Sequence, residues 1–177
     1  MIMKDLDMGK NVKLLDSGEG YSVFGVEDET GNGRMTMYSV FDGVYVMFND
    51  FHMAHCFSYF QPDMEMLFID HCREGRIEWQ TKDGRFIYIE AGDMQLNSRH
   101  YHCCDFCFPL SHYHGVTVGF DLNIAEKALP HIIEGLDVDI RKICRKFCNH
   151  NDTFLMRADR QIEHFFRNCM ICPMISD

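Results

Sequence analysis

His71-Cys-Arg-Glu-Gly-Arg-Ile-Glu-Trp79 opens the stretch of sequence that decides the fold, and Gln-Thr-Lys-Asp83-Gly84 and Arg85-Phe-Ile-Tyr-Ile-Glu-Ala-Gly92-Asp93 complete it. The Asp-Gly pair is typical of a tight hairpin turn, because both residues tolerate a positive φ. Before the turn Ile77 and Trp79 alternate with charged and polar residues, and after it Ile87 and Ile89 alternate with Phe86 and Tyr88. Alternation with a period of two indicates strands with one buried face. The stretch therefore predicts an antiparallel strand pair at the centre of a small double-sheet barrel.

Short strand patterns of the same kind extend over most of the chain. We expect strands at residues 21–26, at 35–41 and 44–49 on either side of a second Asp-Gly turn, and at 111–120. The intervening residues 27–34 have the composition of a loop. Strands that follow one another about every ten residues are typical of an all-β sandwich or barrel.

The periodicity changes from two to about 3.6 residues after position 121, which predicts two or three C-terminal helices. The third helix, at about 156–170, has the clearest apolar stripe, formed by Ile162, Phe165, Phe166 and Cys169. Such a stripe is a candidate dimerisation surface. The alternative is that it packs against the barrel of its own chain.

Composition excludes several classes of function. The 177 residues have a net charge of −10, whereas a nucleic-acid-binding surface needs clustered positive charge. No run approaches 18 apolar residues, and the first residues are too polar for a secretory leader, so we expect no membrane association. Nine cysteines without such a leader indicate free thiols and a cytoplasmic location.

Four segments together resemble the N-terminal sensor domain of AraC-type transcription regulators. They are the segment that begins His71-Cys-Arg-Glu-Gly-Arg, the Gly92-Asp93 turn, Phe108-Pro-Leu-Ser-His-Tyr-His-Gly-Val-Thr-Val118 and Phe154-Leu-Met-Arg-Ala158. The resemblance implies a mainly β fold, a cupin-like (jelly-roll) barrel followed by two or three α-helices. It divides the chain into an N-terminal arm at 1–20, the barrel sensor at 21–121 and a helical dimerisation appendage at 122–177.

The resemblance also implies a function without catalysis. The barrel would take a small-molecule effector, and the helices would pair two subunits into a homodimer. DNA would be contacted only through a separate C-terminal domain of helix-turn-helix units, a pattern that this sequence does not contain. The alternatives that remain open are a metal-dependent cupin enzyme and a thiol or metal sensor.

An effector pocket in a barrel needs apolar walls and a few directed polar groups. The aromatic candidates are Phe68, Trp79 and Tyr88, and the polar candidates are His71, Arg73, His112 and His114. Each aromatic residue has ordinary core packing as its alternative role. Tyr113 alternates with the two histidines along one strand, so it and they cannot both face inward.

The residues give little support for a metal or other cofactor. His112 and His114 share a strand face, but no carboxylate follows them before Asp121, whereas metal-binding cupins have a Glu shortly after such a histidine pair. We therefore expect no cofactor, with a metal at His112 and His114 as the disfavoured alternative. The pairs Cys104-x-x-Cys107 and Cys169-x-x-Cys172 could form a zinc site, but 61 residues separate them.

Overall fold

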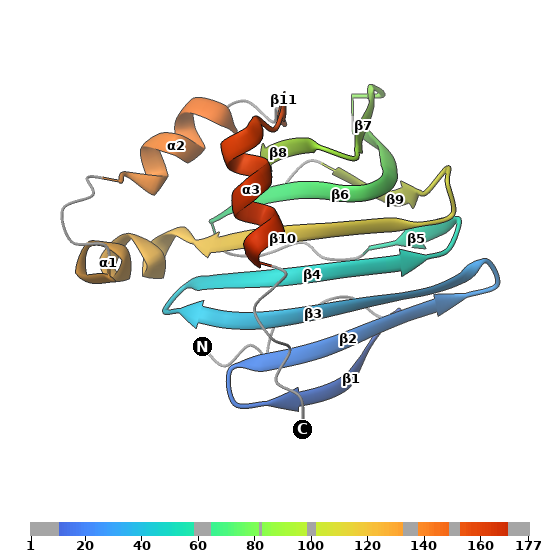
Figure 1. Ribbon diagram of the computed structural model, residues 1–177, viewed down its shortest axis with the longest axis horizontal. Coiled ribbons are helices and arrows are strands. Elements are labelled where there is room, and N and C mark those ends of the chain that lie inside the picture. The colour runs from blue at the N-terminus through green and yellow to red at the C-terminus, as the bar shows by residue number, and fades with distance from the viewer. Residues whose placement is uncertain are drawn as a thin grey trace.

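The computed structural model describes residues 11–58, 65–81, 83–98, 102–132, 138–148 and 153–169. These residues form eleven β-strands and three α-helices (Figure 1). In chain order the elements are β1 (Val12–Gly18), β2 (Tyr21–Asp28), β3 (Gly31–Phe41), β4 (Val44–His52), β5 (His55–Phe57), β6 (Met66–Thr81), β7 (Phe86–Glu90), β8 (Asp93–Asn97), β9 (His102–Cys107), β10 (Tyr113–Asp121), α1 (Leu122–Ile132), α2 (Ile140–Phe147), β11 (Phe154–Arg157) and α3 (Arg160–Cys169).

The strands form one curled antiparallel sheet in the order β1-β2-β3-β4-β10-β6-β8-β11. The first half of β6 pairs with β10 and β8, and its second half pairs with β7 and β9. Gly75 lies between the two halves with a φ of +79°, which glycine adopts without strain. The long strand β6 therefore belongs to both halves of the barrel, and the sheet curls around it (Figure 1).

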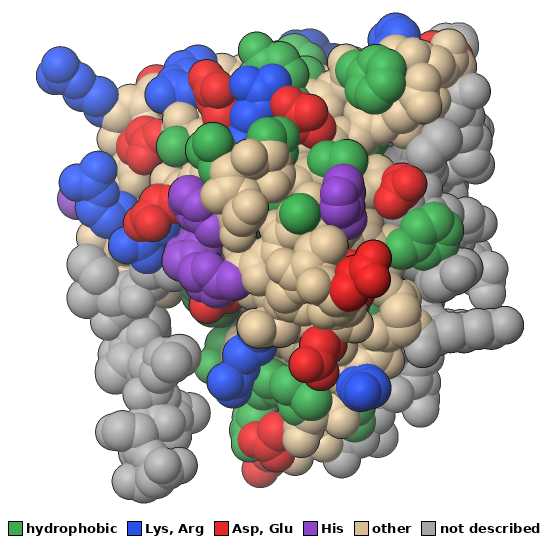
Figure 2. All heavy atoms as spheres, turned by 90° about the vertical axis from the view of Figure 1, so that its right-hand side faces the viewer, with side chains coloured by type: hydrophobic (Ala, Val, Ile, Leu, Met, Phe, Trp, Pro, Cys, Tyr) green, Lys and Arg blue, Asp and Glu red, His purple; other side chains and the backbone are tan. Residues whose placement is uncertain are grey.

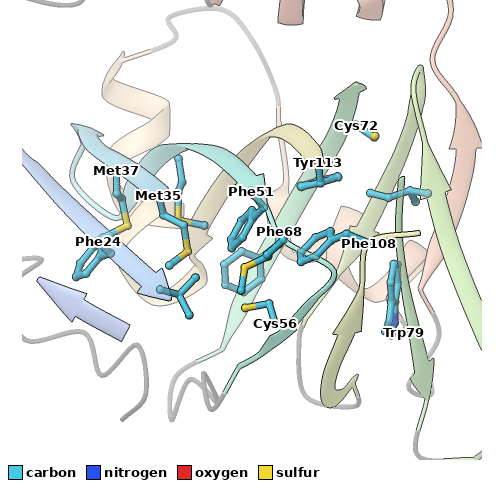
Figure 3. Close-up of a cluster of buried hydrophobic side chains, with 14 of the residues drawn as sticks. Phe24, Met35, Met37, Phe51, Cys56, Phe68, Cys72, Trp79, Phe108 and Tyr113 are labelled. Carbon is cyan, nitrogen blue, oxygen red and sulfur yellow. The ribbon is translucent and has the colours of Figure 1, made fainter. Parts of the chain in front are cut away.

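Both faces of this sheet are apolar. The concave face holds the larger cluster of buried side chains, among them Phe51, Phe68 and Trp79 (Figure 3). The convex face holds a second cluster, in which Leu67, Val116 and other strand residues contact helix residues such as Phe166. The three helices thus cover the convex face, and the concave face lines the barrel interior (Figure 1).

The turns and caps explain where several elements begin and end. Asp42-Gly43 forms the expected two-residue turn between β3 and β4, with a φ of +74° at the glycine. A Cβ at that position would lie 2.7 Å from the amide nitrogen of Ala125, so the turn packs closely against α1. The side chain of Asp139 caps α2 by accepting a hydrogen bond from the amide of Lys142.

The predicted fold class, a mainly β cupin-like barrel with C-terminal helices, is confirmed. The loop expected at 27–34 is wrong, because β2 continues to Asp28 and β3 begins at Gly31. The helix expected at about 156–170 begins only at Arg160, because residues 154–157 form β11 on the edge of β8. In the expected arm, residues 12–18 form β1, whereas residues 1–10 lie outside the described part. Among the described helices, none has the length and apolarity needed to cross a membrane.

Candidate functional site

The barrel interior contains a cavity of about 110 Å³. Aromatic rings form much of its wall. Phe51 stacks on Phe108 with 5.2 Å between ring centroids (Figure 3). The ring centroids of Trp79 and Phe106 are 6.2 Å apart. The aromatic and methionine side chains that line it are Met35, Met37, Tyr45, Met47, Phe51, Phe57, Phe68, Trp79, Phe106, Phe108 and Tyr113. An apolar cavity with aromatic walls is the usual form of a small-molecule site.

A row of polar side chains crosses one wall of this cavity. Thr117, Asp70 and Gln95 are register partners on the adjacent strands β10, β6 and β8. Because partners in a sheet point to the same face, all three side chains face the interior. Each of the three side chains lines the cavity.

Asp70 is the centre of the row and is only 2% exposed. The hydroxyl of Thr117 donates to its Oδ1 at 2.6 Å, and Gln95 Nε2 and Asn97 Nδ2 both donate to its Oδ2 at 2.8 Å. Asn49 Nδ2 extends the row by donating to Thr117 Oγ1 at 3.0 Å. Three short hydrogen bonds from donors therefore hold the carboxyl group of Asp70 in place as an acceptor.

The row leaves one acceptor unused. Gln95 Oε1 is buried and has no hydrogen-bond partner among the described residues. Leaving a buried polar atom unsatisfied costs about 1–3 kcal/mol. A molecule in the cavity that donates a hydrogen bond to this oxygen would remove that cost.

The described cavity residues do not fit a transition-metal centre. Among the described residues of the cavity wall, Asp70 is the one carboxylate, and its oxygens already accept three hydrogen bonds. Burial raises the pKa of the Cys56 thiol, which also lines the cavity, to about 12. The thiol is therefore protonated at neutral pH and is a poor metal ligand. No histidine is among the described residues that line the cavity.

Two of the seven expected ligand-binding residues, Phe68 and Trp79, line the cavity. The other five lie outside it, which corrects the expected composition of the pocket. Arg73 is exposed and forms an ion pair with Glu74 at 3.4 Å. Tyr88 is half-exposed, with the guanidinium of Arg76 3.8 Å from its ring centroid. The side chains of Arg73 and Tyr88 point out of the barrel, because the adjacent residues Cys72 and Ile89 on their strands belong to the inner cluster.

His71 is buried on the convex face, under α3. Its ring stacks on Phe166 with centroids 4.5 Å apart and planes at 8°, and its Nε2 lies 3.5 Å from Glu163 Oε1. Burial lowers the pKa of His71 below its ordinary value, although the neighbouring Glu163 acts in the opposite direction. His71 therefore connects β6 to the third helix instead of facing a cavity.

His112 and His114 also lie outside the cavity. Tyr113 points inward and lines the cavity, so His114 faces outward in line with Val116, Val118 and Phe120. The apolar residues of this row are covered by the helices, whereas His114 lies beyond them and is near Asp50 and His52. His112 precedes β10, and its Nδ1 lies 3.1 Å from the carbonyl oxygen of Leu110.

The apolar stripe of α3 is divided between two environments. Phe166 is 5% exposed and packs on the barrel of its own chain, whereas Phe165 is 57% exposed. Ile162 and Cys169 are half-buried.

Of the residues in the two Cys-x-x-Cys pairs, Cys107 places its sulfur 3.5 Å from His55 Nδ1. The Cys104 side chain and Cys172 lie outside the described residues.

The polar row was missed in the sequence analysis, although a signal for it exists. Asn49, Asp70, Gln95 and Thr117 each interrupt the mainly apolar inner face of the sheet. A single polar residue in a buried strand needs hydrogen-bond partners, and the neighbouring strands can supply them. Four such interruptions on adjacent strands predict a buried network.

The solved structures that this chain resembles share little sequence identity with it and superpose on it only in part. The Ylba protein from E. coli has 8% identity over 62% of this chain and 49% of that chain, with a TM-score of 0.40. A putative ethanolamine utilization protein, EutQ from Salmonella typhimurium, has 14% identity over 64% of this chain and 97% of its own, with a TM-score of 0.37. Oxalate decarboxylase from Bacillus subtilis has 11% identity over 90% of this chain and 46% of that chain, with a TM-score of 0.34.

The chain thus spans about half the length of the Ylba protein and of the decarboxylase. No protein-family model matches the sequence, and no curated protein matches it. The fold and the cavity together define a cupin-like barrel domain.

Proposed function

We propose that this domain binds one small molecule in the barrel cavity, and that it acts as the sensor and dimerisation module of an AraC-type transcription regulator, without catalysis. The observation that carries the binding proposal is the buried Asp70 row in an aromatic cavity. Polar groups placed at one point of an apolar pocket orient a ligand, and the walls supply its affinity.

The size of the cavity limits the ligand. An apolar cavity of about 150 Å³ holds benzene, which has six carbon atoms. A cavity of about 110 Å³ therefore fits a molecule of roughly six non-hydrogen atoms or fewer. The methionine side chains in the wall can change rotamer to admit a somewhat different shape.

The charge of the wall indicates the polar group of the ligand. Asp70 contributes a carboxylate to the cavity wall, and Gln95 Oε1 is an acceptor without a hydrogen-bond partner among the described residues. Aromatic rings attract cations through their electron-rich faces. These features favour a small amine or alcohol that donates hydrogen bonds, and they disfavour a carboxylate or phosphate.

The strand β6 offers a route from the cavity to the helices. Asp70 faces the cavity, and the next residue, His71, stacks on Phe166 of α3. A ligand that binds more tightly to one position of β6 than to another would shift the position of α3 as well. The exposed Phe165 on the outer side of α3 would then meet the partner subunit, and attached DNA-binding units would respond.

The binding proposal is tested by a thermal-shift screen with small amines, alcohols and carboxylates. A ligand of the folded state must raise the melting temperature. We expect amines or alcohols to do so and carboxylates not to. Ile77→Phe, which enlarges a half-buried side chain of the wall, should abolish the shift, and Gln80→Ala, an exposed change on the same strand, should preserve it. A shift that survives Ile77→Phe would contradict binding in the cavity.

The dimerisation proposal is tested separately by sedimentation velocity. Phe165→Glu places a charge on the exposed side of α3 and should convert a dimer into a monomer, whereas the exposed change Arg160→Gln, on the same helix, should not. A wild-type protein that remains a monomer at all concentrations, with and without a ligand from the screen, would refute this part. The result leaves the binding proposal unaffected.

A further inference from the structure

Asp50, His52 and His114 form a cluster on the convex face, outside the barrel cavity and beyond the helices. Asp50 and His114 are register partners on β4 and β10, and His52 lies two residues after Asp50 on the same face. Figure 2 looks onto the end of the molecule where β4 ends and β10 begins, and histidine side chains gather on that surface. Pairing in the sheet, and not a flexible loop, therefore brings these groups together.

The ligand atoms of this cluster are close enough to share an ion. Asp50 Oδ1 lies 3.0 Å from His52 Nε2 and 3.1 Å from His114 Nε2, and all three atoms lie within 4.8 Å of one another. Bonds of about 2.0–2.1 Å to a tetrahedral or octahedral ion place neighbouring ligand atoms roughly 3.0–3.4 Å apart. Small rotations of the side chains would thus complete three coordination positions.

An ion pair without metal is the competing explanation for this geometry. His114 Nε2 is shielded from solvent and lies near Asp50 Oδ1, yet it makes no hydrogen bond with the described residues. The rings of His52 and His114 are 5.2 Å apart at 83°, so both present their Nε2 edges to the same carboxylate. Two Nε2 atoms beside one carboxylate are accommodated either by an N–H on each ring that points to the carboxylate or by a metal ion that both rings and the carboxylate share.

We propose that Asp50, His52 and His114 bind one divalent first-row transition-metal ion, for which Zn²⁺ is the probe. Two imidazoles and one carboxylate are borderline ligands that suit zinc, nickel, cobalt and copper. Water would fill the remaining positions, since His52 and Asp50 are exposed. The site is distinct from the barrel cavity and does not depend on the proposed function.

The consequence of metal binding follows from the residues between the ligands. Phe51, between Asp50 and His52, and Tyr113, next to His114, are register partners whose rings line the cavity 6.4 Å apart. An ion at the convex face would therefore fix β4 against β10 directly behind this part of the cavity wall. It would stabilise the folded state by the free energy of binding.

The test is calorimetric titration of ZnCl₂ into the whole chain after treatment with a chelator and a reductant. Three proteins are compared: the wild type, the site variant His52→Gln/His114→Gln, and the control His131→Gln/His164→Gln, which removes two exposed histidines from helices. The cysteines are common to all three proteins, so zinc bound to thiols cancels in the comparison.

We expect the site variant to lose one ion per chain, or at least tenfold in affinity, relative to both other proteins. Zinc should also raise the melting temperature of the wild type and the control by more than that of the site variant. Asp50→Asn, which keeps the shape and removes the charge, should weaken binding as well. Equal titrations for all three proteins would overturn the proposal. Equal melting temperatures without zinc will show that the substitutions leave the fold intact.

Discussion

Replacing Phe166 by alanine tests how the third helix is held on the barrel. This ring is 5% exposed, stacks on His71 and belongs to the cluster between the sheet and the helices. Removing a buried Phe side chain costs about 3–5 kcal/mol. The neighbouring Phe165, which is 57% exposed, is the matched control, and in the monomeric protein its replacement by alanine should cost within about 0.5 kcal/mol.

Amide hydrogen exchange of residues 160–169 is the suitable assay, because a short helix near the end of the described chain can open without unfolding the barrel. Every 1.4 kcal/mol changes an equilibrium constant about tenfold. Phe166→Ala should therefore accelerate exchange in α3 by roughly a hundredfold to several thousandfold, and Phe165→Ala by less than about threefold.

The comparison has a clear contrary result. If Phe165→Ala accelerates exchange as much as Phe166→Ala, and does so more strongly at low protein concentration, the stability of α3 depends on a second subunit. If neither variant changes exchange, the helix is not held by the contacts described above. The second result would refute the role of Phe166 as the principal contact of α3 with its own barrel, whereas the first would indicate that Phe165 contacts a second subunit.

Three further predictions concern single side chains. Thr117→Val removes the hydroxyl that joins the buried carboxylate to its amide neighbour and should lower the free energy of unfolding in urea by about 1–3 kcal/mol, with an unchanged midpoint as the contrary result. Burial lowers the pKa of His71 below 6.5, so the unfolded chain binds more protons than the folded chain below pH 6.5, and the free energy of unfolding should fall as the pH decreases from 6.5. His71→Gln should reduce this dependence. Identical plots of unfolding free energy against pH for the wild type and the variant would contradict the prediction. A hydrogen bond with a neighbouring thiol lowers the pKa of Cys144 to about 7, whereas burial raises those of Cys56 and Cys72 to about 12, so iodoacetamide at pH 7.5 should modify Cys144 well before the other two in peptide mass spectra.

The sequence was sufficient for the strands around β6 but not for the orientation of every strand. Ile77, Trp79 and Ile89 face inward, and Phe86 and Tyr88 are exposed on the other side, so the alternation is observed although Tyr88 was expected in the pocket with Trp79. In these strands the outer residues are polar or exposed, so only one face can be the core. The periodicity then identifies the inner face without further information.

The orientation of β10 could not be predicted in the same way. Val116, Val118 and Phe120 form an apolar row, yet they face the helices, and Tyr113 and Thr117 face the cavity. Both faces of this strand are covered, so hydrophobicity does not distinguish inside from outside. The positions of His112 and His114 relative to the cavity depended on that choice.

The candidate site was predicted only in its aromatic part. Phe68 and Trp79 were identified as wall residues, whereas Asp70 was not considered, because one carboxylate in the sequence does not reveal its partners on other strands. Those partners are 25–47 residues away along the chain, and only the register of the sheet brings them together. The cluster of Asp50 with His114 depends on the same long-range pairing.

The position of β10 between β4 and β6 has a consequence for how the chain acquires its structure. Strands β1 to β4 can pair in sequence as they leave the ribosome, but β4 and β6 have no common neighbour until residues 113–121 have been synthesised. Until then, two strand edges and much apolar surface remain exposed, a state that is prone to aggregation. Fragments that end before residue 121 should therefore be insoluble, and refolding should be slow, because its decisive contacts join distant segments.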